Sequence, residues 1–124
     1  MPTGTELRAA TPADAPAVRA VARESWHAAR DEVLGAAAVD AVLDDWYAAA
    51  DVAGSIRHEA THTFLAVDDD EVVGFSEGRP TDEGPADAVV SRIYLRPAHW
   101  GEGYGTALLE RLLDALRSDG HESV

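Results

Sequence analysis

The sequence predicts a mixed α/β fold, and three features indicate this. Two short apolar segments, 63–67 and 72–77, flank an acidic turn and together predict an antiparallel hairpin. A segment rich in β-branched residues, 88–95, is followed by a glycine-rich turn and a leucine-rich helix. A helix start also follows a short first strand near the N-terminus. Strands and helices that alternate in this way are typical of domains in which helices cover a sheet.

The first elements are predicted from local signals. Residues 5–10 form a short first strand, and Thr11 is the expected N-cap of a helix with Pro12 at its first position. This helix is expected to run to about residue 30, with these residues inward: Val18, Val21, Ala22, Ser25 and Trp26. Gly35 breaks the pattern, and a second helix is predicted over residues 37–50.

Length and composition exclude several classes of protein. The 124 residues predict a single domain, 1–124, with one core. No apolar run is long enough to span a membrane, and the N-terminus lacks the blocks of a signal peptide, so we expect a cytoplasmic protein without a membrane partner. The absence of cysteine excludes disulfides and thiolate metal sites.

The net charge is −13, and all ten basic residues are arginines. Such a charge repels nucleic-acid backbones, so no nucleic-acid partner is expected. An acidic surface without lysine suggests a halophilic protein, because salt screens the self-repulsion that would destabilise the compact state. A cationic partner or substrate is the alternative explanation of the charge.

The glycine-rich turn predicts an anion site. Gly101, Gly103 and Gly105 precede a helix whose apolar residues recur at spacings of three and four, namely Leu108, Leu109, Leu112, Leu113 and Leu116. The first N–H groups of a helix have no internal partner, and glycines let a phosphate approach them closely. The alternative is that the turn only makes a tight connection. The turn matches neither the Walker loop, which needs a lysine, nor G-x-G-x-x-G.

Residues 94–97 (YLRP) and 101–109 (GEGYGTALL) resemble the acyl-CoA-binding motif of the GCN5-related N-acetyltransferases (the GNAT family). The resemblance implies a central, mostly antiparallel sheet flanked by helices. It also implies that acetyl-CoA is the cosubstrate and that a primary amine of a small molecule or protein accepts the acetyl group, with no metal. A homodimer is compatible with it.

The resemblance also implies residue roles. The backbone of Ile93, Tyr94 and Leu95 would lie along the pantetheine arm, which pairs with the first and last of them. The backbone of these residues would cradle the pyrophosphate: Gly101, Glu102, Gly103, Tyr104, Gly105 and Thr106. Trp100 stands where the family usually has glutamine or arginine, which removes a side-chain donor from the cofactor site.

The catalytic residues are less clearly marked. Members of the family often use a glutamate on the central strand as a base, but the matching positions here are Val89 and Ser91. Ser91 could hold a water molecule, and Glu77 and Asp87 are the nearest acids in sequence. We therefore predict Glu77 and Ser91 as catalytic. The alternative for Glu77 is an ordinary solvent-facing strand residue.

The family also implies an acceptor site bordered by the first two helices. Its wall would be built from Trp26, Trp46 or Tyr47, and the alternative is that these aromatic residues belong to the core.

The C-terminus ends early for this family. Gly120 resembles a helix C-cap, and the next residues look like the start of a strand, where the family continues with a fifth strand and further elements. We expect a chain truncated before that strand, either as a fragment or naturally. The alternative function is therefore a non-catalytic CoA-binding or interaction module of the same fold.

One further motif is a decoy. His58, Glu59 and His62 match the H-E-x-x-H pattern of zinc proteases, which needs both histidines one helical turn apart. A strand is predicted to start at residue 63, and Gly54 and Ser55 come just before the motif, so no suitable helix is expected. Two solvated loop histidines are the simpler interpretation.

Overall fold

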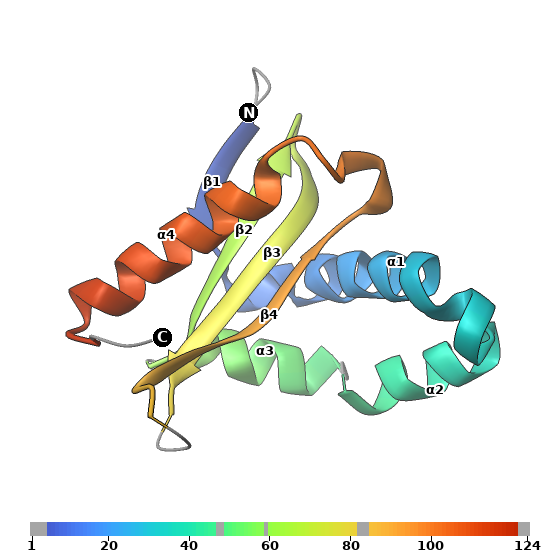
Figure 1. Ribbon diagram of the computed structural model, residues 1–124, viewed down its shortest axis with the longest axis horizontal. Coiled ribbons are helices and arrows are strands. Elements are labelled where there is room, and N and C mark those ends of the chain that lie inside the picture. Colours follow the sequence, from blue (N-terminus) through green and yellow to red (C-terminus); the bar gives the residue numbers. More distant parts are fainter. Residues whose placement is uncertain (1–4, 47–48, 59, 82–84, 122–124) are drawn as a thin grey trace.

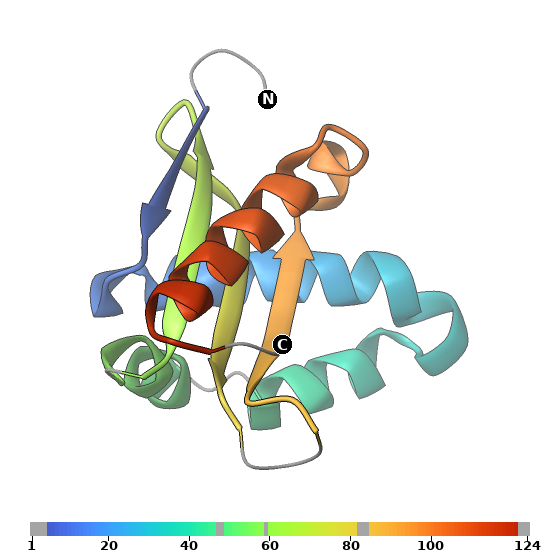
Figure 2. The same cartoon turned by 60° about the vertical axis from the view of Figure 1, so that its left-hand side comes forward.

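The structure is a computed structural model that describes residues 5–46, 49–58, 60–81 and 85–121. Its four strands form one antiparallel sheet in sequence order, β1 (Thr5–Ala9), β2 (His62–Asp68), β3 (Glu71–Pro80) and β4 (Ala88–Leu95). The helix α1 (Ala15–Leu34) lies against one face, with α2 (Ala36–Trp46) and α3 (Ala49–Arg57) packed against it, and α4 (Tyr104–Ser118) lies on the other face (Figure 1, Figure 2). The predicted mixed α/β fold is confirmed.

The sheet separates two clusters of buried side chains. Side chains alternate between the faces of a strand, so Leu65 of β2 packs toward α1 while Phe64 packs toward α4. Phe75 of β3 joins the first cluster, and Tyr104 and Leu108 of α4 belong to the second. The sheet is therefore covered by helices on both faces, and its open region is an edge rather than a face.

The start of α1 follows the predicted signals. A short 3₁₀ turn, η1 (Pro12–Asp14), precedes the helix, and the backbone N–H of Thr11 donates to Asp14 Oδ2 at 2.8 Å. Arg8 of β1 donates two hydrogen bonds to the same carboxylate, at 2.9 and 3.0 Å. The helix then runs to Leu34, beyond the predicted end near residue 30, and stops at Gly35, whose φ is 81°.

Replacing Asp14 with alanine should lower the free energy of unfolding by about 1–2 kcal/mol, because the capping box and the partner of Arg8 are lost together. The hydrogen bond from Arg8 is the main reason that the pKa of Asp14 falls to about 2. The carboxylate therefore stabilises the fold above the ordinary aspartate pKa, and this contribution is lost as the pH falls through about 2. Urea unfolding at pH 7 and pH 2 should show the variant and wild type converging in acid, and an equal difference at both values would contradict this.

The prediction of one helix over residues 37–50 is wrong. The structure has two helices there, α2 and α3, and Gly54 and Ser55 lie inside α3 rather than in a loop. The helix forms in spite of them because Val52 is buried and Ala53 and Ile56 pack on the same core. Tertiary burial thus outweighs the low helix propensity of glycine, about 1 kcal/mol relative to alanine.

The H-E-x-x-H residues do not share a helical turn. His58 follows the last residue of α3, and His62 is the first residue of β2; Glu59 lies outside the described residues. In the part of the chain that the structure describes, no cluster of histidine and acidic side chains could hold a metal ion. No described helix is both long enough and apolar enough to cross a membrane.

Candidate functional site

The outer edge of β4 is open. Leu95 pairs with Gly74 of β3, Tyr94 pairs with Phe75, and the backbone N–H of Arg96 donates to the Val73 carbonyl at 2.8 Å. Hydrogen-bonded and non-bonded pairs alternate along an antiparallel ladder, so Ile93 and Leu95 direct their backbone groups away from β3. Among the described residues no strand pairs with this edge. The groups expected to meet the pantetheine arm therefore face an open edge.

A β-bulge interrupts β4 near its middle. Glu77 is opposite Arg92 and Gly78 is opposite Val90, so Ser91 is an extra residue without a partner in the register. The Ser91 hydroxyl donates to the Glu77 carbonyl at 3.1 Å. The bulge reverses which residues of β4 face α4 on its two sides. This reversal of facing occurs at two neighbouring residues, Val90 and Ser91.

The glycine turn lies at the end of this edge and leads directly into α4. Gly101 and Gly103 have φ values of 80° and 89°, which only glycine adopts readily. Gly103 is the N-cap of α4, and no side chain caps the helix there. A Cβ on either glycine would meet nothing within 4 Å, so the space beside each of these two residues is open. Such an uncapped helix start can hold an anion through its first N–H groups.

The other residues of the predicted cradle differ in what they offer. Tyr104 is fully buried and its ring packs edge-on against His99, so only its backbone can face a ligand. Glu102 and Thr106 are exposed, and Thr106 lies in the first turn of α4. The structure brings all six residues, 101–106, together at one end of β4. Their role in cofactor binding stays a prediction.

No basic side chain belongs to the cradle itself. Arg96 and Arg111 are the nearest arginines in sequence, and the Arg111 guanidinium lies over the Phe64 ring. The Nε of Arg96 donates to the Val72 carbonyl at 2.9 Å, and its guanidinium pairs with Glu24 of α1. Arg96 therefore ties the end of β4 to α1 and to the β2–β3 hairpin. An anion in the cradle would be held by backbone groups.

Trp100 carries a donor, but the donor is already used. Its indole Nε1 donates to the Leu95 carbonyl at 2.9 Å, while the side chain is 48% exposed. The predicted loss of a donor at the usual glutamine or arginine position is thus qualified. The indole N–H is a donor, but it is already hydrogen-bonded to the Leu95 carbonyl at the open edge of β4.

Glu77 is not a solvent-facing residue, so that alternative interpretation is wrong. Its side chain is 6% exposed, and Oε2 lies 3.6 Å from Arg92 Nη1 on the neighbouring strand. Burial raises the pKa of Glu77, while the positive charges of Arg92 and Arg79 oppose this shift. The structure brings Glu77 and Ser91 together across β3 and β4. Their catalytic roles stay predictions.

Two parts of this region escaped the sequence analysis. Arg92 was not identified, because its position opposite Glu77 depends on the bulge. Trp26 does not form the predicted acceptor wall, because it is 8% exposed and belongs to the core under the sheet, as the alternative interpretation expected. Tyr47 and the side chain of Trp46 lie outside the described residues.

The chain belongs to the acetyltransferase (GNAT) family, whose pattern matches residues 18–124. This match covers most of the sequence and confirms the resemblance carried by residues 94–109. No curated protein matches the sequence significantly.

Solved structures share the fold at low sequence identity. PaiA N-acetyltransferase from Thermoplasma acidophilum, solved with coenzyme A, has a TM-score of 0.84 at 21% identity, over 94% of this chain and 74% of that one. A GCN5-related N-acetyltransferase from Rhodopseudomonas palustris has a TM-score of 0.72 at 22% identity, over 97% and 70% of the two chains. Ribosomal-protein-alanine N-acetyltransferase from Brucella melitensis has a TM-score of 0.61 at 17% identity, over 92% and 72%.

Proposed function

We propose that this protein is an acetyl-CoA-dependent N-acetyltransferase that acts on a primary amine of a small molecule or protein. The observation that carries the proposal is the uncapped, glycine-led start of α4 beside the open edge of β4. Membership of the GNAT family supports it, as does the presence of coenzyme A in the Thermoplasma structure.

The proposed site divides the cosubstrate between two kinds of backbone group. The N–H groups of residues 101–106 hold the pyrophosphate, and the backbone of Ile93 and Leu95 pairs with the amides of the pantetheine arm. This directs the thioester along β4 toward the bulge at Ser91. The amine nitrogen attacks the thioester carbonyl carbon, the C–S bond breaks, and a proton leaves the nitrogen. A backbone N–H at Leu95 or a neighbour meets the developing oxyanion.

Glu77 is the proposed base, acting directly or through a water held at Ser91. A carboxylate of ordinary pKa is too weak a base for an amine near neutral pH, and burial raises the pKa of Glu77 toward the useful range. Its position beside the bulge puts it near the part of β4 that the thioester would reach.

A non-catalytic CoA-binding module is the second candidate. The observation in its favour is that both predicted catalytic side chains already have structural partners, Glu77 with Arg92 and Ser91 with the Glu77 carbonyl. The two candidates share the cradle and differ only in turnover.

Isothermal titration of acetyl-CoA into the 124-residue chain in molar KCl, followed by an amine screen for thiol release, tests both. Micromolar binding with release of CoA on any amine supports the enzyme. Binding without release on small amines and on peptide N-termini would favour the module. No binding to the chain would count against both.

We also propose that the protein is adapted to high salt, on the basis of its charge of −13. The Debye length falls from about 10 Å at 0.1 M salt to about 3 Å at 1 M, so repulsion among the spread carboxylates should weaken. The melting temperature should rise by several degrees between 0.1 M and 2 M KCl, and NaCl should act alike because screening depends on ionic strength. Equal melting temperatures in dilute and concentrated KCl would refute the proposal.

A further inference from the structure

A row of polar side chains crosses the sheet on the face that packs against α1. Thr63 of β2 lies opposite Glu77 of β3, and Glu77 lies opposite Arg92 of β4. Side chains alternate along a strand, so each of the first two shares its face with the residue two positions away, Leu65 or Phe75. Those two residues pack in one buried cluster with α1. Thr63 and Glu77 are themselves buried, with 7% and 6% of their surface exposed, so two polar side chains lie side by side in an apolar region.

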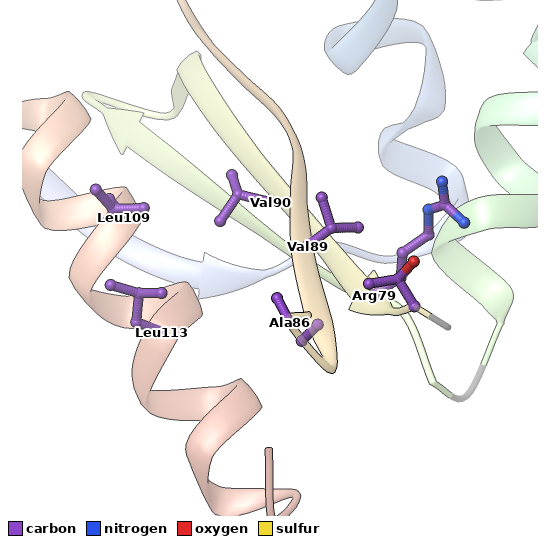
Figure 3. Close-up of a pocket in the computed structure, with 8 residues that line it drawn as sticks. Arg79, Ala86, Val89, Val90, Leu109 and Leu113 are labelled. Carbon is purple, nitrogen blue, oxygen red and sulfur yellow. The ribbon is translucent and has the colours of Figure 1, made fainter. Parts of the chain in front are cut away.

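The next residue of β3 on this face supports the assignment. Arg79 follows Glu77 by two positions, and its guanidinium points away from Leu109 and Leu113 of α4 (Figure 3). The positive charges of Arg79 and Arg92 both act on Glu77. The carboxyl group of Glu77 therefore lies between two cations and the threonine of the neighbouring strand.

The Thr63 hydroxyl has no partner. Its oxygen is buried, and no described residue forms a hydrogen bond with it. The carbonyl of Thr63 accepts a hydrogen bond from the Ala10 N–H at 2.8 Å, so the backbone carbonyl is satisfied and the side chain is not. Most buried polar groups in proteins are hydrogen-bonded, because an unpaired one costs free energy. A partner that the hydroxyl meets in one state of the protein would explain this exception.

Glu77 is that partner on geometric grounds. Directly opposite residues of an antiparallel pair have Cβ atoms about 4.5–5.5 Å apart, so rotation about χ1 can bring the Thr63 hydroxyl to the Glu77 carboxyl group. On the other side, Arg92 Nη1 lies 3.6 Å from Glu77 Oε2, but a guanidinium only donates hydrogen bonds. It can serve the carboxylate and cannot accept from the protonated acid. A hydroxyl both donates and accepts, so Thr63 suits either form.

We propose that Thr63 is a positioning residue for the base: its hydroxyl donates to the Glu77 carboxylate before the reaction and accepts from the carboxylic acid after it. The inference rests on the proposed function, in which Glu77 takes the amine proton. That proton moves to a carboxyl oxygen of Glu77 as the C–N bond forms and the C–S bond breaks, and it passes to solvent after the product leaves.

The pKa of Glu77 tests the inference without any acceptor amine. NMR follows the glutamate carboxyl carbons against pH in the 124-residue chain in molar KCl, and Glu77→Gln identifies the signal of Glu77. Thr63→Val keeps the shape of the side chain and removes the hydroxyl. A hydrogen bond to a charged group is stronger than one between neutral groups, so its loss should raise the pKa of Glu77 by about half a unit to one unit. Thr63→Ser should restore the wild-type value, and Thr63→Ala should shift it in the same direction as valine if Thr63→Val does not fold.

Ser76→Ala is the matched control. Ser76 precedes Glu77 on β3 and is fully buried, but its hydroxyl lies on the opposite face and donates to the Leu108 carbonyl of α4 at 3.3 Å. This variant also loses a buried hydroxyl and should lose stability in urea unfolding. It should leave the pKa of Glu77 unchanged.

The rate supplies a second measurement once the screen has found an amine. Thr63→Val should lower kcat about tenfold, leave KM unchanged and move the pH at which the rate rises upward. An unchanged pKa of Glu77 in Thr63→Val, or an equal shift in Ser76→Ala, would overturn the inference and leave the proposed function standing. Full activity of Glu77→Gln would overturn the assignment of the base and this role of Thr63 with it.

Discussion

Replacing Gly103 with valine should weaken acetyl-CoA binding by about 100-fold or more. Gly103 has a φ of 89° and is the N-cap of α4, and a Cβ there would meet nothing within 4 Å. In the proposed cradle we expect a valine side chain to compete with the pyrophosphate for this open space. Each charge-assisted hydrogen bond is worth about 1.5–3 kcal/mol, and loss of two gives a change of this size. Isothermal titration in molar KCl measures it.

Gly35→Val is the matched control. Gly35 has a φ of 81° at the end of α1, and a Cβ there would also meet nothing within 4 Å. Both variants should lose stability, by about 1–3 kcal/mol for Gly103→Val in the left-handed helical region and at least as much for Gly35→Val, whose ψ of 146° lies outside that region. Only Gly103→Val should lose binding. Gly105→Val tests a cradle residue that has no positive φ and should also abolish binding. If Gly103→Val binds acetyl-CoA as Gly35→Val does, the cradle is wrongly assigned.

Replacing Glu77 with glutamine should lower kcat by about 10²–10⁴ and leave the affinity for acetyl-CoA unchanged. Glutamine keeps the size of the side chain but loses the charge that pairs with Arg92, and it cannot take a proton from the amine. Because burial raises the pKa of Glu77, the wild-type rate should climb as the pH rises through that pKa, when the carboxylate forms. The rate of thiol release measured against pH should show this rise for the wild type and not for the variant.

Arg92→Gln provides an independent check on this assignment. The positive charge of Arg92 lowers the pKa of Glu77 and opposes the effect of burial. Removal of this charge should therefore move the rise in rate to higher pH. The rate at high pH should be nearly kept, provided that the variant folds, which circular dichroism verifies. A Glu77→Gln variant with full activity would make Glu77 a structural residue and would favour a different base.

The glycine turn could be predicted from the sequence because its signals are local. Three alternate glycines, a strand before them and a leucine pattern after them all lie within about thirty residues. The structure keeps that order, with β4 ending at Leu95 and α4 starting at Tyr104. The hairpin of β2 and β3 was predictable for the same reason.

Residues whose roles depend on other elements could not be predicted. The helix α3 contains Gly54, and the packing of Val52, Ala53 and Ile56 on the core outweighs the low helix propensity of that glycine. The Glu77–Arg92 pair requires the register of β3 and β4, which shifts at Ser91. A bulge of this kind has no reliable sequence signal, because the extra residue costs little at an open edge.

The hydrogen bond from the Trp100 indole to the Leu95 carbonyl sets how often this carbonyl is available to a ligand in the free protein. A neutral bond of this kind at an exposed position is worth about 0.5–1.5 kcal/mol net, so the free protein should leave this carbonyl available for about 10–30% of the time. A ligand that needs the carbonyl then loses between threefold and tenfold in apparent affinity relative to a chain without the indole. In return, the indole covers this acceptor for most of the time, so the open edge is a poorer template for pairing with another chain.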